Sequence, residues 1–74
     1  MSVERQELAV LQAPYRREIR LENARFESGM DMLRIVIREG HRITQVDLDE
    51  ETARSMSAVM LAWAESHPAA SQSE

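Results

Sequence analysis

The sequence predicts an α+β fold, in which a three-stranded antiparallel β-meander is followed by a C-terminal helix packed on one face of the sheet. Three runs rich in strand formers are separated by glycine-containing turns, and an amphipathic run that begins with a helix cap comes last. A chain of 74 residues forms one domain and removes only about 60% of its unfolded surface from water. We therefore expect a thin core.

The three predicted strands are REIRLENARFES, DMLRIVIRE and RITQVDL, at residues 17–28, 31–39 and 42–48. Gly29 and Gly40 are each followed by one residue before the next strand begins, which predicts type II′ turns. In the second hairpin this turn places Ile37 opposite Thr44, Ile35 opposite Val46 and Leu33 opposite Leu48. In the first hairpin it places Phe26 opposite Leu33. A bulge near Glu22-Asn23 then brings Leu21 opposite Ile37, unless a bend divides this strand into two.

The run DLDEETARSMSAVMLAWAESH predicts a helix with Asp49 as its N-cap and two acids in its first turn. One apolar stripe is wide enough to cover a three-stranded sheet; it contains Ala53, Met56, Val59, Met60 and Trp63. Three more apolar residues lie off this stripe and form a candidate helix interface, namely Ala58, Leu61 and Ala62. We expect the N-terminal arm or another copy of the chain to cover them.

The chain divides into a 1–15 arm, a 16–66 β-β-β-α domain and a 67–74 tail that is expected to be disordered. The arm is expected to be disordered or to form a short helix, because Val3, Leu8 and Leu11 have helical spacing before Pro14. The predicted core consists of Ile19, Leu21, Phe26, Leu33, Ile35, Ile37, Val46, Leu48, Met56, Met60 and Trp63.

The outward sheet face is rich in arginine, and the predicted registers set Arg25 beside Arg34 and Arg20 beside Arg38. Three interpretations remain open. The face is a solvated layer of ion pairs, a protein interface centred on Val36 and Ile43 with an arginine rim, or a surface that grips an anion such as a phosphate backbone. The candidate partner or anion face consists of Arg20, Arg25, Arg34, Val36, Arg38 and Ile43.

The sequence gives little indication of a catalytic or metal-binding site. There is no cysteine, and His41 and His67 stand apart from any cluster of acids. No nucleophile has an adjacent base, and no glycine-rich loop precedes a helix. We therefore expect no enzymatic activity, no cofactor and no metal. The charged N-terminal residues and the lack of a long apolar run predict a cytoplasmic protein without a membrane contact.

Two segments, ARFESGMDMLRIVI and VDLDEETARSM, resemble short uncharacterised proteins of α-proteobacteria, a resemblance that implies no activity. Over residues 17–66 the order of elements is similar to that of the PC4-like transcriptional coactivator family. Members of that family dimerise and bind single-stranded DNA on a four-stranded sheet. No motif matches residue by residue, so the resemblance implies topology alone.

Taken alone, the sequence favours a small cytoplasmic protein-interaction module that forms a homodimer, because the helix has surplus apolar surface and the small fold has no disulfide or zinc. The alternative is a module that binds single-stranded nucleic acid on the arginine-rich sheet face. A net charge of −4 argues against general nucleic-acid binding. Seven arginines nevertheless fall within residues 16–42.

Overall fold

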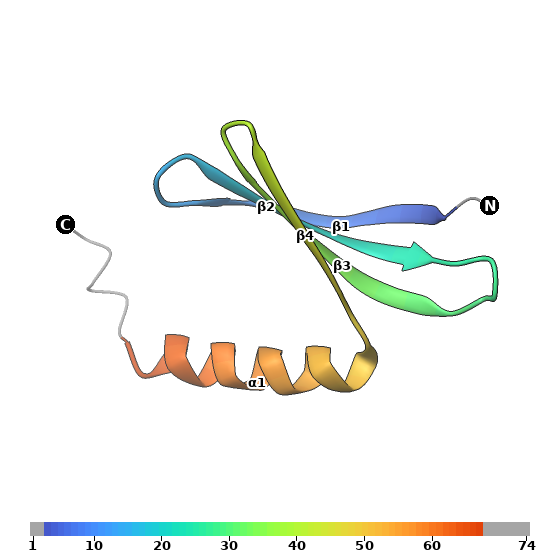
Figure 1. Ribbon diagram of the computed structural model, residues 1–74. Helices are drawn as coiled ribbons and strands as arrows, with labels where there is room; N and C mark the ends of the chain where they lie inside the picture. The colour runs from blue at the N-terminus through green and yellow to red at the C-terminus, as the bar shows by residue number, and fades with distance from the viewer. Residues whose placement is uncertain (1–2, 68–74) are drawn as a thin grey trace.

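The computed structural model describes residues 3–67, which form a four-stranded antiparallel sheet followed by one helix (Figure 1). The strands are β1 (Glu4–Ala13), β2 (Arg17–Arg25), β3 (Asp31–Glu39) and β4 (Arg42–Leu48), and the helix is α1 (Glu50–Glu65). Each strand pairs with the next along the chain, in the order β1-β2-β3-β4. The α+β class and the C-terminal helix are confirmed, whereas the predicted count of three strands is wrong.

The extra strand is β1, which replaces the predicted N-terminal helix. Its residues pair with β2 from Glu4↔Arg25 to Ala13↔Arg17, with a register shift between Glu7 and Ala9. That shift adds one residue to the strand and breaks the period-two pattern, so the apolar residues acquire a spacing that resembles a helix. Ladder hydrogen bonds to the open side of β2 outweigh the helix propensity of this segment. The predicted 67–74 tail, apart from His67, lies outside the described residues.

Of the two predicted hairpin registers, the β3-β4 register is confirmed and the β2-β3 register is wrong. Ile37↔Thr44, Ile35↔Val46 and Leu33↔Leu48 pair in the β3-β4 hairpin as predicted. The β2-β3 hairpin instead pairs Ala24↔Met32, three positions from the predicted partner Ile35, and Leu21↔Ile35, two positions from the predicted partner Ile37, without a bulge in β2. The reason is a longer loop, in which Phe26 N–H donates to the Met30 carbonyl and Gly29 N–H donates to the Phe26 carbonyl. Gly29 thus follows a turn and does not start one.

These registers give the sheet two different faces, because alternate residues point to opposite sides. The apolar sheet face carries Ala9, Leu11, Ala13, Ile19, Leu21, Leu33, Ile35, Ile37, Val46 and Leu48. The charged sheet face carries Glu7, Glu18, Arg20, Glu22, Arg34, Arg38 and Asp47. Only Ala24 and Glu22 are buried among the described residues, and both belong to the charged side.

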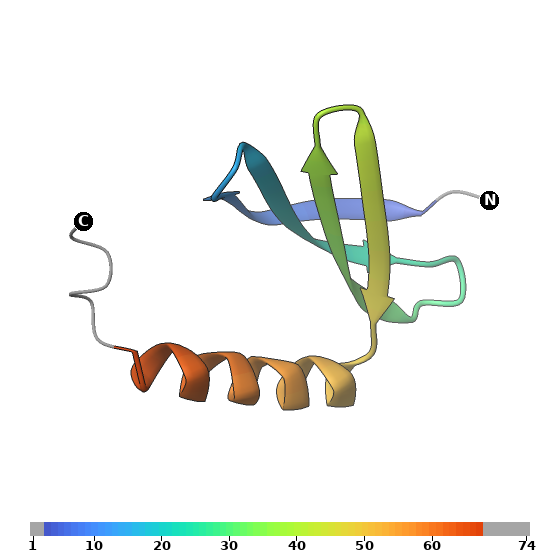
Figure 2. The same cartoon turned by 60° about the vertical axis from the view of Figure 1, so that its left-hand side comes forward.

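Helix α1 stands away from the sheet after its first turn (Figure 2). It contacts only β3 and β4, and Ala53 is its only half-buried residue. The predicted core is therefore wrong for the helix, since Met56, Met60 and Trp63 are exposed. Val46 is exposed as well, and Phe26 lies half-buried in the β2-β3 loop. The remaining predicted core residues share the apolar sheet face but are only half-buried.

The turns offer a direct test of the backbone. Gly40 has φ 63°, and an added Cβ would meet nothing within 4 Å, so Gly40→Ala changes the backbone energy alone. We expect this substitution to lower the free energy of unfolding by about 1–2 kcal/mol, the cost of a left-handed conformation for an ordinary residue. Urea denaturation at a fixed chain concentration measures the change.

Arg16, at φ 61°, provides the opposite case, and Arg16→Asn should raise the free energy of unfolding, because asparagine tolerates this conformation. A Gly40→Ala variant as stable as the wild type would contradict the turn geometry.

Candidate functional site

The apolar sheet face is the largest uncovered apolar surface of the sheet. Its residues in β2 and β3 are half-buried, while Leu11 and Val46 on the edge strands are exposed. In a two-layer domain such a face is covered by a packed helix or by a second sheet. Within residues 3–67 only the first turn of α1 reaches it. The face is therefore available to another polypeptide.

The apolar stripe of α1 is the second uncovered surface. Met56 is 41% exposed, and the exposed fraction lies between 60% and 69% at Val59, Met60 and Trp63, farther from the sheet. Trp63 gains one local contact, a stacked arrangement with the His67 ring at 4.2 Å between centroids. The candidate helix interface of Ala58, Leu61 and Ala62 is also exposed, on the other side of the helix.

A notch of about 320 Å³ lies where α1 leaves the sheet, and its lining joins the two apolar surfaces. Leu33 and Leu48 contribute from the sheet and Ala53 contributes from the helix. Four polar residues also line the notch, Asn23, Asp31, Asp49 and Glu50. A volume near the lower limit of small-molecule sites suits an apolar side chain better than a substrate.

The charged sheet face is a layer of ion pairs. Arg34 lies between Glu22 and Asp47 in the register and donates from Nε to Asp47 Oδ1 at 2.9 Å. Its side chain is only 11% exposed, and the hydrogen bond from Arg34 to Asp47 raises the pKa of Arg34 further. Arg20 lies 3.9 Å from carboxylate oxygens of both Glu7 and Glu22. The arginines of this face are thus close to acids.

Glu22 is the one charged residue that these neighbours bury, at 5% exposure. Its Oε1 atom and the Arg20 Nε atom are buried without a hydrogen-bond partner. Long side chains from the adjacent strands close over this carboxylate, so the centre of the charged face is occupied by its own residues. Sequence reasoning missed this burial because the predicted register set arginine beside arginine.

The structure brings five of the six candidate face residues together. Arg20, Arg34, Val36, Arg38 and Ile43 share the charged side, whereas Arg25 lies on the opposite side, opposite Asp31. The observed register replaces the predicted like-charge neighbours with Glu22↔Arg34 and Glu18↔Arg38. The predicted register placed arginines side by side, and such like-charge pairs are unfavourable, which already argued against that register. Of the two apolar candidates, Ile43 is exposed and Val36 is half-buried.

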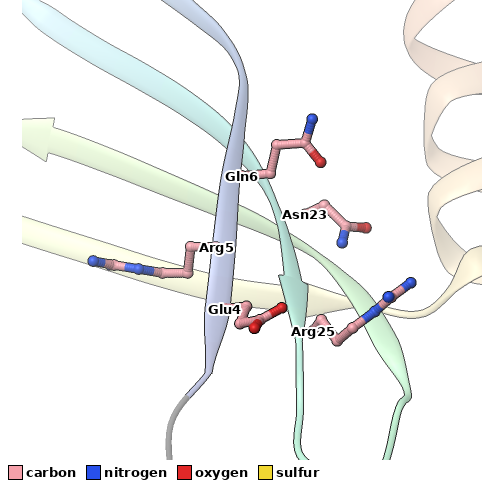
Figure 3. A pocket seen from close by; sticks show the side chains of 5 residues that line it. All are labelled: Glu4, Arg5, Gln6, Asn23 and Arg25. Atoms are coloured by element: carbon pink, nitrogen blue, oxygen red, sulfur yellow. The ribbon is translucent and has the colours of Figure 1, made fainter.

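Arg25 belongs to a different corner of the molecule. Its guanidinium makes two hydrogen bonds to Asp31, at 2.8 and 3.0 Å. Beside it lies a polar depression of about 220 Å³, shown in Figure 3, toward which Gln6 and Asn23 point while Arg5 points to the other side of the sheet. This depression is smaller than typical ligand sites and lacks an apolar floor. Its residues stabilise the ends of β1 and β2 at most weakly.

Other chemistry finds no site in the described part of the chain. His41 occupies a turn, and His67 lies at the end of α1, where its Nδ1 atom donates to the Trp63 carbonyl oxygen at 2.7 Å. Within residues 3–67 no three His, Asp or Glu side chains gather closely enough to hold a metal ion. Helices long and apolar enough to cross a membrane are likewise absent from these residues.

Comparisons with known proteins add one match. A family model described as "Family of unknown function (DUF6967)" matches residues 2–66. No curated protein matches the chain, and no solved structure matches it either. None of these comparisons shows the resemblance to the PC4-like family.

The half-buried ion pair between Arg34 and Asp47 gives a prediction about stability. Asp47→Ala leaves the Arg34 guanidinium without its hydrogen-bonded partner, and we expect the free energy of unfolding to fall by about 1–3 kcal/mol. Asp31→Ala breaks a pair of the same two residue types at an exposed position, so its effect should be much smaller. Parallel urea titrations compare the two variants, and equal losses would contradict the difference in burial.

The helix cap gives a pH prediction. Hydrogen bonds from Thr52 lower the pKa of Asp49, and the hydrogen bond from Arg25 lowers the pKa of Asp31. Carboxylates with lowered folded-state pKa values add stability that is present above the unfolded value of about 3.9 and is lost as pH falls through the folded value. We expect stability to decline below about pH 4.

Asp49→Asn should weaken this pH dependence, because asparagine keeps the cap but does not titrate. An unchanged slope in urea titrations between about pH 2.5 and pH 6 would count against this role of Asp49.

Proposed function

We propose that this chain, which belongs to the DUF6967 family of unknown function, is a small cytoplasmic protein-interaction module that works as a homodimer. One observation supports the proposal most. The apolar sheet face and the apolar stripe of α1 are both uncovered in a single chain, although each is the kind of surface that normally covers the other. The cytoplasmic location is an expectation from the sequence. The proposal includes no enzymatic activity, cofactor or metal.

The exposed area supports an obligate partner. One chain exposes 6255 Å². The relation for compact monomers gives about 4,700 Å² at a mass of 8.5 kDa, so the whole chain of 74 residues exposes about 1,500 Å² more than a compact monomer. A standard protein interface removes about 800 Å² from each partner. An interface of standard size is therefore compatible with the exposed area of the whole chain.

A second copy fits this surface better than an unrelated protein does. A two-fold dimer is formed by one patch that is complementary to itself. Here each chain carries a sheet face that lacks a helix and a helix that lacks a sheet. Two copies can satisfy both deficits at once, whereas a single foreign helix would leave the stripe of α1 uncovered.

The charged sheet face offers less support for the alternative, nucleic-acid binding. Arg20 and Arg34 are already close to acids, and Arg25 lies on the other side of the sheet with Asp31. Each arginine would have to exchange a carboxylate for a phosphate. Binding of this kind depends on unpaired positive charge and on stacking aromatic side chains. Tyr15, the only exposed tyrosine or phenylalanine, stands in a turn beside Arg17.

Sedimentation equilibrium tests the dimer together with two matched variants. Wild-type chains should sediment at twice the 8.5 kDa mass of one chain across the micromolar range. Met60 and Leu61 are 60% and 59% exposed but lie on different sides of α1. Met60→Glu should weaken dimerisation at least 100-fold, because it places a charge in the apolar stripe. Leu61→Glu should have a smaller effect.

The control is built into this pair, since both variants add the same charge at the same exposure in adjacent positions. The indole emission of Trp63 gives a second readout and should shift to longer wavelength when Met60→Glu chains dissociate. A wild-type chain that is monomeric at high micromolar concentration, with both variants unchanged in solubility and stability, would refute the proposal.

A further inference from the structure

The connection between β4 and α1 restricts where the helix can go. Strand β4 ends at Leu48 and α1 begins at Glu50, so Asp49 is the only connecting residue. Asp49 is extended, with φ −81° and ψ 175°, and its Oδ1 atom accepts a hydrogen bond of 2.8 Å from the Thr52 N–H. The connection is therefore both short and fixed by the helix cap, so the helix cannot turn back over its own sheet.

The position of β4 adds a second restriction. It is an edge strand, so α1 starts at the rim of the sheet and not over its centre. Figure 1 shows the helix leaving the end of β4, and only its first turn stays near the sheet. No part of α1 contacts β1 or β2. A chain's own helix thus leaves most of its own apolar sheet face uncovered.

We propose that two copies exchange their helices, so that α1 of each chain packs across the apolar sheet face of the other. This inference rests on the proposed homodimer and adds its arrangement. The lengths agree: a helix of 16 residues is about 24 Å long, and four strands span about 14 Å. One helix is long enough to cross all four strands of the partner.

Exchange also accounts for the distribution of exposure along the helix. Ala53 at the start of α1 is half-buried next to its own sheet, while the stripe residues beyond it are exposed, namely Met56, Val59, Met60 and Trp63. In the exchanged dimer the first turn stays with its own chain, and the rest of the stripe lies on the partner. The notch beside Ala53 is the place where the two sets of contacts meet.

A longer connection should convert the dimer into a monomer. Domain exchange is favoured by short connections, and lengthening them lets an element return to its own chain. We expect five Gly/Ser residues inserted between Leu48 and Asp49 to give a folded monomer by sedimentation, with Trp63 emission as blue as in the wild-type dimer. The same insertion between Ser28 and Gly29, in the β2-β3 loop, should leave the dimer intact.

Cross-linking tests the exchange in the chain without an insertion, which has no native cysteine. Thr44 and Gln45 are exposed neighbours on β4, and Thr44 lies on the apolar side while Gln45 lies on the charged side. A mixture of Thr44→Cys and Val59→Cys chains, treated with a short bismaleimide, should give a covalent heterodimer. A mixture of Gln45→Cys and Val59→Cys chains should give at least tenfold less.

The outcomes separate this inference from the proposed function. A wild-type dimer that remains dimeric with the Leu48-Asp49 insertion would overturn helix exchange and leave the homodimer standing. Equal cross-linking of the Thr44 and Gln45 mixtures would overturn it as well. If the insertion variant fails to fold, the cross-linking of full-length chains decides. A monomeric wild-type chain would overturn both proposals.

Discussion

The single-residue connection at Asp49 governs the arrangement of the whole molecule. It joins an edge strand directly to a helix and holds the first turn through a hydrogen bond between the Asp49 carboxylate and the Thr52 N–H. Because the helix leaves from the rim of the sheet, its apolar stripe and the apolar sheet face stay apart within one chain. Burial of apolar surface is the main favourable contribution to folding. We therefore propose that a second copy of the chain supplies contacts that most small domains make internally.

The charged sheet face has a different physical role. Ion pairs at Arg34 and Arg20 lie beside Glu22, and Glu22 and Ala24, on the same side of the sheet, are the only buried residues within 3–67. Such a layer adds little stability per pair, because charges must leave water to form it. It does keep this side of the sheet polar. A dimer in which the partner's helix covers each apolar sheet face leaves both charged faces in contact with water.

Much of the fold could be predicted from local patterns. The β3-β4 hairpin followed from Gly40 and from apolar pairing, and α1 followed from the Asp49 cap and the helical period. Strand β1 could not be predicted in the same way, because its bulge disrupts alternation. The predicted β2-β3 register was wrong because it placed Gly29 at the start of the turn, whereas Gly29 follows the turn. The shift of three positions placed Arg25 on the charged sheet face in the prediction, whereas the structure places it on the apolar side.

The candidate site was predicted only in part, for a related reason. Helical spacing identified the stripe of Met56, Met60 and Trp63, and the sequence placed it against the sheet of the same chain. Periodicity shows which residues share a face but does not show what covers that face. The answer depends on the length and direction of the β4-α1 connection, which is a property of the tertiary structure.

The most direct measurement is an isotope-filtered nuclear Overhauser experiment on a mixture of labelled and unlabelled chains. It reports contacts between the Trp63 indole and the methyl groups of Ile19, Ile35 and Ile37 only when the two partners belong to different molecules. Helix exchange predicts strong signals between chains. The absence of these signals at a concentration where the protein is dimeric would contradict it.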